Sequence, residues 1–281
     1  MNLFDGLEKF GIKASQDRGL YDEERQAEKE EEEKLKTKTS EPREEDFLLE
    51  KTIRCPVCDK TFKSIVMKTG KAKRLESDRD LRPRQQYIDG LKYDVSACPH
   101  CGYAALNRYF EHLTTGQINL IQEQICSNFQ PTMITPGIRC ISYDEAIGKH
   151  KLSLYNAVIK KARTSEKAYN CLIISWLFRG KAEQLGSAHP EYQDCVNEEE
   201  TFYKEAYEGL MKSVASETFP ICGMDQNTMD YILAVMSAYF KQYEVASKCL
   251  SRVLTSSTAN HKVKELALAL KTEIIAELKK R

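Results

Sequence analysis

The chain has 281 residues, and its 42 basic and 42 acidic side chains leave no net charge at neutral pH. This length is enough for one large domain or two modest domains with a hydrophobic core. No apolar run of about 18 residues is present, which argues against a membrane-spanning helix. Residues 1–13 lack the charged and apolar regions of a secretory signal, so the sequence predicts a cytoplasmic protein without a membrane partner.

The N-terminus carries a short amphipathic pattern over residues 1–14, in which Leu3, Leu7 and Phe10 share one helical face. So short a helix is unstable alone, and we expect it to dock either on the rest of the chain or on a partner. The next segment, residues 15–46, is rich in Glu and Lys and has almost no apolar face. It is predicted to be a solvated linker, either disordered or helical.

Charge is unevenly distributed along the chain, which suggests a second interpretation of this linker. Residues 1–50 carry 16 acidic and 9 basic side chains, whereas residues 51–92 carry 5 acidic and 12 basic ones. Opposite charges in neighbouring segments attract each other. The linker can therefore also be interpreted as an acidic arm that folds over the basic segment.

Residues 47–103 are predicted to form a zinc-ribbon module around two Cys-x-x-Cys pairs. The pairs are Cys55 with Cys58 and Cys98 with Cys101, and a proline follows the first cysteine of each. A gap of two residues lets both thiolates of a pair reach one ion, and Zn²⁺ prefers four such ligands in a tetrahedron. Four protein ligands leave no open coordination position, so the predicted role of the ion is structural.

The flanks of the two pairs support the ribbon interpretation. Alternating apolar residues predict short strands at residues 64–67, after the first pair, and 93–96, before the second. Gly102 is expected to supply a residue in the left-handed region of backbone conformation at the end of the second pair.

Two other chemistries remain open for the cysteines. The segment Cys98–Gly102 also resembles the rubredoxin type, in which four thiolates hold iron for electron transfer. Asp59 stands where such a protein has glycine, and the ring of core aromatic residues is missing. A dithiol redox pair needs a strand–helix setting that neither pair has. His100 is expected to face solvent rather than to act as a further ligand.

Between the two pairs, residues 68–92 form a connecting loop that mixes eight basic with four acidic side chains. Basic side chains can contact phosphates, and Tyr87 can stack on a base, so one interpretation is nucleic-acid binding. A second is a salt-bridged loop packed on the ribbon or on the helices. A third is a surface that docks a protein.

From residue 104 onward the hydrophobic pattern is helical and predicts an all-α domain over residues 104–281. Ser142 opens a capping box with Glu145, and Ser165 is expected to cap the following helix. Six further cysteines lie singly in these patterns and are predicted to be small buried hydrophobes. The expected helices span residues 104–113, 117–129, 142–161, 165–185, 198–217, 229–240, 243–254 and 263–278.

These helix lengths and short turns are typical of stacked antiparallel helix pairs, so the domain is predicted to be tetratricopeptide-like. The best local match joins Leu233-Ala234 on one helix to Tyr243-x-x-Ala246 on the next. Ala234 and Ala246 are the small residues expected to let these helices approach closely. The predicted fold class is therefore mainly α, with a small β zinc-ribbon module before the helical-hairpin domain.

Several motifs together resemble domain-of-unknown-function family 2225, a family of uncharacterised bacterial proteins. The resemblance spans nearly the whole chain, and it implies a zinc ribbon fused to a tetratricopeptide-like body in a bacterial cytoplasm. It implies no activity. The residues that carry it are Cys55-Pro-Val-Cys58 with Phe62, Asp78-Arg-Asp80, Arg82-Pro83, Tyr93-Asp94-Val95, Cys98-Pro-His-Cys101-Gly102-Tyr103-Ala104, Trp176-Leu177-Phe178-Arg179, Tyr243-x-x-Ala246 and the opening Leu3-Phe4-x-Gly6-Leu7-Glu8-Lys9-Phe10-Gly11.

The sequence contains no recognisable catalytic motif, nucleotide-binding glycine pattern or histidine pair at ligand spacing. It therefore predicts neither an enzyme nor a small-molecule substrate. The predicted function is that of a zinc-binding scaffold that binds a protein or peptide through its helical surface and connecting loop. The alternatives are a nucleic-acid-binding regulator that uses residues 51–92, and an iron electron-transfer module.

Overall fold

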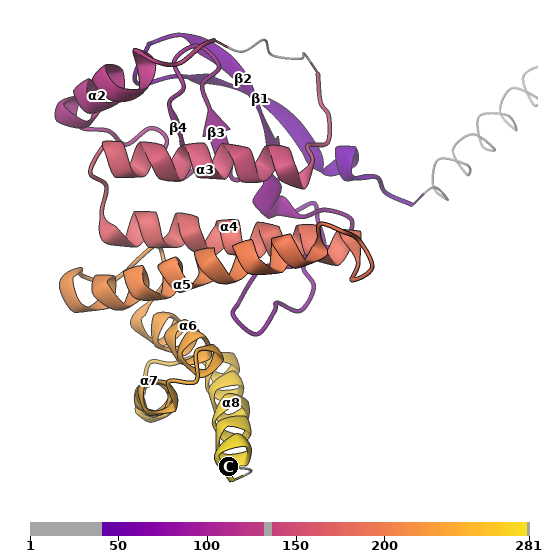
Figure 1. Ribbon diagram of the computed structural model, residues 1–281, viewed down its shortest axis with the longest axis vertical. Coiled ribbons are helices and arrows are strands. Elements are labelled where there is room, and N and C mark those ends of the chain that lie inside the picture. Colours follow the sequence, from indigo (N-terminus) through magenta and orange to yellow (C-terminus); the bar gives the residue numbers. More distant parts are fainter. Residues whose placement is uncertain (1–40, 132–136, 280–281) are drawn as a thin grey trace, which may run out of the picture. The chain divides into compact units, whose positions relative to one another are not determined.

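A computed structural model describes residues 41–131 and 137–279 of the chain (Figure 1). Residues 1–43 and 44–281 form two units, and the second holds the helices and strands of the described residues. The predicted amphipathic segment and the predicted linker as far as residue 40 lie outside the described residues.

The described chain is mostly helical, which confirms the predicted mainly-α fold class. Among these residues no helix combines the length and the apolar character that a membrane crossing needs. The helices are α2 (Thr115–Ile121), α3 (Tyr143–Ile159), α4 (Thr164–Leu185), α5 (Tyr192–Ser216), α6 (Gln226–Tyr239), α7 (Tyr243–Thr255) and α8 (His261–Lys279).

Two antiparallel hairpins precede the helices. In the first, β1 (Leu48–Arg54) pairs with β2 (Thr61–Met67), and in the second, β3 (Val95–Ala97) pairs with β4 (Ala104–Leu106). Each Cys-x-x-Cys pair lies in the turn of one hairpin. The predicted strands at 64–67 and 93–96 coincide with the end of β2 and overlap β3.

The predicted helix over residues 104–113 is wrong, because this segment begins with β4 and continues in turns. All three β4 residues are buried. A short apolar run buried on every side has the same pattern in a strand as in a helix. The predicted boundary after residue 103 consequently falls inside the second hairpin.

Consecutive helices pack against each other: α3 on α4, α4 on α5, α6 on α7 and α7 on α8, with α8 also against α6. Figure 1 shows α3, α4 and α5 in successive layers, with the second hairpin on the far side of α3. Helix α5 lies close to α4 at Gly209, since a Cβ there would lie 2.6 Å from that of Ala168. Ala234 and Ala246, expected between α6 and α7, are fully buried.

Helix ends agree with the predictions at one position and differ at two others. Ser142 caps α3 as expected, because its Oγ accepts a hydrogen bond from the Glu145 N–H at 3.1 Å. The predicted cap at Ser165 is wrong: this residue lies inside the first turn of α4, and its Oγ donates to Glu217 at 2.6 Å. Helix α5 begins at Tyr192, earlier than the predicted residue 198.

The helix α3 contains a fully buried histidine whose protonation opposes folding. Burial lowers the pKa of His150 to about 4, and its Nδ1 lies 2.8 Å from the Ala146 carbonyl oxygen. In the unfolded chain a histidine titrates near pH 6.5. Acidification therefore protonates the unfolded state first, and the folded state loses about 1.4 kcal/mol per pH unit between pH 6.5 and about 4.

We expect this histidine to account for about 2 kcal/mol of lost stability between pH 7 and pH 5. Asp94 acts in the opposite direction, because burial raises the pKa of its carboxyl to about 6. The contribution of His150 is therefore measured as the difference between wild type and His150→Leu in urea unfolding at both pH values. Equal pH dependence in the two proteins would contradict the assignment.

Candidate metal centre

The two cysteine pairs, both of the form Cys-Pro-x-Cys, have the same local backbone structure. In the first, the Cys55 N–H donates to the Lys60 carbonyl oxygen at 2.9 Å, and the Asp59 N–H donates to that of Cys55 at 2.9 Å. In the second, the Cys98 N–H donates to Tyr103 at 2.7 Å, and the Gly102 N–H donates to Cys98 at 3.0 Å. Each turn thus folds its two thiols to one side of a hairpin, and we call these turns the knuckles.

Both knuckles need a residue in the left-handed backbone region immediately after the second cysteine. The prediction for Gly102 is confirmed: its φ is +77°, and a Cβ there would lie 2.5 Å from the Phe129 ring. In the first knuckle the same position holds Asp59, with φ of 63°. Aspartate tolerates this region better than most residues, and an exposed ion pair with Arg54 at 2.6 Å orients its side chain.

The knuckles bring together the sulfur atoms of the four predicted ligands, all within 4.8 Å of one another. The Sγ atoms of Cys55 and Cys101 are 3.6 Å apart, and those of Cys58 and Cys98 are 3.7 Å apart. A disulfide needs about 2.05 Å, whereas four thiolates about 2.3 Å from one ion in a tetrahedron are separated by about 3.8 Å. The four side chains therefore fit a tetrahedral metal ion and can hold one.

Most of the four thiols are buried, and hydrogen bonds among them shift their pKa values. Cys55, Cys98 and Cys101 are buried, while Cys58 is half-buried. Hydrogen bonds from Cys101 and Cys55 hold the pKa of the Cys98 thiol well below its ordinary value, and the hydrogen bond with Cys55 raises the pKa of Cys101. Cys98 is thus more readily ionised than Cys55 and Cys101, and a bound cation would stabilise its thiolate.

A separate hydrophobic core, which we call the knuckle core, encloses the cluster. A π-helical turn, Gln122–Cys126, follows α2 and closes over the first knuckle, where the Gln122 amide donates to the Val57 carbonyl oxygen at 3.0 Å. Helix α3 holds the second knuckle through buried Asn156, which donates to the Gly102 carbonyl oxygen at 3.1 Å. The buried members of this core are Ile53, Cys55, Val57, Phe62, Cys98, Cys101, Tyr103, Ala105, Phe110, Ile121 and Ile125.

Two features of this core were missed from the sequence. Aromatic rings do surround the cysteines: Tyr103 packs on Phe110 at 4.9 Å between centroids, and Phe62 packs on the same ring at 5.9 Å. The expectation that core aromatic residues are missing is therefore wrong. In addition, Cys126 packs against the knuckle core, where burial raises the pKa of its thiol. Neither feature has a spacing that a sequence pattern could reveal.

The connecting loop packs on the helices through buried charges, which confirms the second interpretation of its sequence. Asp80 is 3% exposed and accepts hydrogen bonds from Trp176 Nε1 at 2.8 Å and Arg179 Nη2 at 2.9 Å. A buried carboxylate needs a partner of opposite charge, and the Arg179 guanidinium is that partner. The loop is thereby fixed to the middle of α4.

Two of the loop's basic residues, Arg82 and Arg84, also face the helix rather than solvent. Arg82 is 2% exposed and lies 3.2 Å from Glu183, while Arg84 donates to Asp78 at 2.6 Å and to Glu183 at 2.7 Å. These guanidiniums are engaged in ion pairs within the protein. They are therefore poorly placed to contact the phosphates of a nucleic acid.

The acidic end of the predicted linker contacts the same segment. Glu44 accepts a hydrogen bond from the Tyr93 hydroxyl at 2.7 Å and forms an ion pair with buried Lys92 at 2.5 Å. One ion pair thus joins the end of the predicted linker to the basic segment, and the interpretation of the linker as an acidic arm stays a prediction. The rest of that arm lies outside the described residues.

A protein-family model matches most of the chain. A family model described as an uncharacterized protein conserved in bacteria (DUF2225) matches residues 48–274. No curated protein and no solved structure matches the chain. The matched range contains both knuckles, the connecting loop and nearly all of the helices, which confirms the resemblance found in the sequence.

Proposed function

The chain belongs to the DUF2225 family of uncharacterized proteins conserved in bacteria, and from its own geometry we propose that it is a non-enzymatic, zinc-binding scaffold that binds a protein or peptide. The observation that carries this proposal is the closed set of four thiols, three of them buried and one half-buried, at the turns of two hairpins. Four protein ligands complete the coordination of a zinc ion and leave no position for a substrate. An ion at this site would therefore stabilise the structure.

Zinc suits the site because the hairpins are short and have little core of their own. The β3–β4 hairpin contains three residue pairs, and its knuckle core is small compared with that of the helices. A structural zinc contributes folding free energy directly, on the order of 10 kcal/mol. Iron remains the alternative, since the same four thiolates hold it in rubredoxin-type sites.

The scaffold role rests on how rigidly the site is connected to the helices. The second knuckle is tied to α3 through Asn156, and the connecting loop between the knuckles is fixed on α4 through Asp80 and Arg179. Such a frame holds the loop and the helical surface in one arrangement, which favours a partner-binding surface. A bacterial cytoplasm, with its reduced thiols, is the compartment proposed for it.

Metal analysis of the purified full-length protein tests the proposal. We expect one zinc per chain and, after anaerobic loading with Co²⁺, the visible absorption of a tetrahedral four-thiolate site. Removal of the metal by a chelator should accelerate amide hydrogen exchange at Cys98 and Gly102, while α4 and α5 remain protected. Stoichiometric iron with a visible spectrum would favour the electron-transfer alternative, and a metal-free protein with an unchanged exchange pattern would overturn the structural role.

A further inference from the structure

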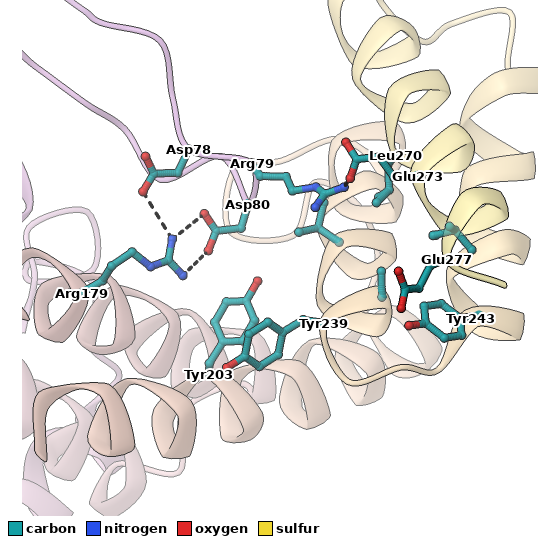
Figure 2. A pocket seen from close by; sticks show the side chains of 13 residues that line it. Asp78, Arg79, Asp80, Arg179, Tyr203, Tyr239, Tyr243, Leu270, Glu273 and Glu277 are labelled. Atoms are coloured by element: carbon teal, nitrogen blue, oxygen red, sulfur yellow. Dashed lines mark hydrogen bonds and ion pairs between the residues drawn. The ribbon is translucent and has the colours of Figure 1, made fainter. Parts of the chain in front are cut away.

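A cavity of about 560 Å³ lies between the tip of the connecting loop and the later helices (Figure 2). The loop contributes Asp78, Arg79 and Asp80 to one wall, and side chains from α4 to α8 form the rest. This volume is in the range of pockets that take a small molecule or a few side chains of a peptide. The cavity is distinct from the metal centre.

Tyrosines give the cavity an aromatic surface. Tyr203 and Tyr239 pack edge to face with ring centroids 5.3 Å apart, and Tyr243 lies on α7 across the cavity. The Arg179 guanidinium lies over the Tyr203 ring at 5.9 Å, so a cation already occupies one aromatic face. Tyr239 is 55% exposed. An exposed tyrosine ring attracts ammonium and guanidinium groups through its π electrons.

The lining of the cavity has more negative than positive side chains, which also favours a cation. The lining has four carboxylates and two guanidiniums, those of Arg79 and Arg179, and Arg84 outside the lining also pairs with Asp78 at 2.6 Å. Arg179 is committed to Asp78 at 3.4 Å, Asp80 at 2.9 Å and Glu199 at 2.7 Å. The other two carboxylates of the lining, Glu273 and Glu277, lie on α8, and Figure 2 shows Arg79 reaching across to Glu273.

We propose that this cavity binds a lysine or arginine side chain of a partner peptide, and that Arg79 occupies the position of that side chain in the free protein. The proposal deepens the scaffold function and rests on it. Both Arg79 and Glu273 are half exposed, at 51% and 59%, and an ion pair this exposed contributes little. An incoming cation can therefore displace Arg79 from Glu273 at low cost and pack on Tyr239.

The backbone of the loop does not depend on this ion pair. The Tyr231 hydroxyl donates to the Arg79 carbonyl oxygen at 3.0 Å, and Asp80 is held by its buried partners on α4. Replacement of the Arg79 side chain should therefore leave the wall of the cavity in place. The variant Arg79→Gln removes the internal competitor without removing the site.

Fluorescence anisotropy with short labelled peptides tests the proposal on the full-length protein. The probes are octapeptides of Gly, Ser and Leu that carry two arginines or two lysines, and matched peptides with two glutamines or two glutamates instead. We expect salt-sensitive binding of the basic probes only. Arg79→Gln should tighten it by about two- to fivefold, and Glu273→Gln should weaken it by about two- to fivefold.

Further variants distinguish binding in the cavity from attraction to surface charge in general. Tyr239→Leu should weaken binding of the basic probes by about three- to fivefold. Two matched controls remove an exposed charge elsewhere, Arg54→Gln and Glu198→Gln, and should leave the affinity unchanged. Circular dichroism and thermal unfolding of each variant establish that it is folded.

The proposal is overturned if no basic probe binds at millimolar concentration, if the glutamine probe binds equally well, or if Arg79→Gln weakens or does not change binding. Metal content is determined on the same preparations. A protein with one zinc per chain and no peptide binding would refute the cavity proposal while leaving the structural role of the metal intact. A protein purified without metal would refute the structural role of the metal.

Discussion

Replacing Cys98 with serine is expected to abolish metal binding and to lower the free energy of unfolding by about 5 kcal/mol or more. Cys98 is 1% exposed, and its sulfur lies 3.7 Å from that of Cys58. A serine hydroxyl is a poor zinc ligand, so the ion would lose one of four ligands, and the two hairpins would lose their common attachment. The knuckle core remains, which limits the loss to part of the zinc binding energy.

The matched control is Cys126→Ser, which removes a half-buried thiol from the same core. We expect it to retain one metal per chain and to lose about 1 kcal/mol. Metal content and guanidinium unfolding of both variants provide the measurement. If Cys126→Ser lost its metal as well, Cys126 would be a ligand, and if Cys98→Ser kept both metal and stability, the assigned ligand set would be wrong.

The second large effect is expected from Asp80→Asn in the connecting loop. The change removes one of the negative charges that face the largely buried Arg179 guanidinium. It also weakens the hydrogen bond from Trp176. Removing one partner of a buried ion pair costs about 3–5 kcal/mol, because the remaining charge has lost its water as well as its partner. Because Asp78 and Glu199 still face Arg179, we expect a loss near the lower end of this range in urea unfolding at pH 7.

An exposed ion pair serves as the control for this prediction. Glu198 and Lys151 are 3.1 Å apart with side chains 47% and 46% exposed, and Glu198→Gln should cost less than about 1 kcal/mol. A similar, small effect of Asp80→Asn and Glu198→Gln would show that the loop is not anchored by buried charge. A large effect of both would instead point to a sensitivity to net charge.

The cluster of four cysteines could be predicted from the sequence because its chemistry is local. Two cysteines separated by two residues reach one ion whatever surrounds them, and the left-handed conformation at Gly102 follows from the same turn. The strands were harder to predict. Residues 104–106 are Ala-Ala-Leu, a segment without a preference strong enough to distinguish a strand from a helix, and only pairing with β3 decides its structure.

The role of the connecting loop could not be decided from its sequence for a different reason. Alternating Asp and Arg residues are compatible with phosphate contacts and with internal ion pairs. The choice depends on Arg179 and Glu183, which lie about a hundred positions further along the chain. The cavity was likewise hidden, because its walls come from the loop and from five helices. Partners this distant in sequence are brought together only by the fold.

The order of the cysteines along the chain has a topological consequence. Cys58 and Cys98 are 40 positions apart, and the connecting loop lies between them. An ion held by both knuckles closes this segment into a ring and restricts the unfolded chain, as a cross-link does. Where thiols stay reduced, such an ion takes the place of a disulfide bridge, and the segment it encloses carries one wall of the cavity.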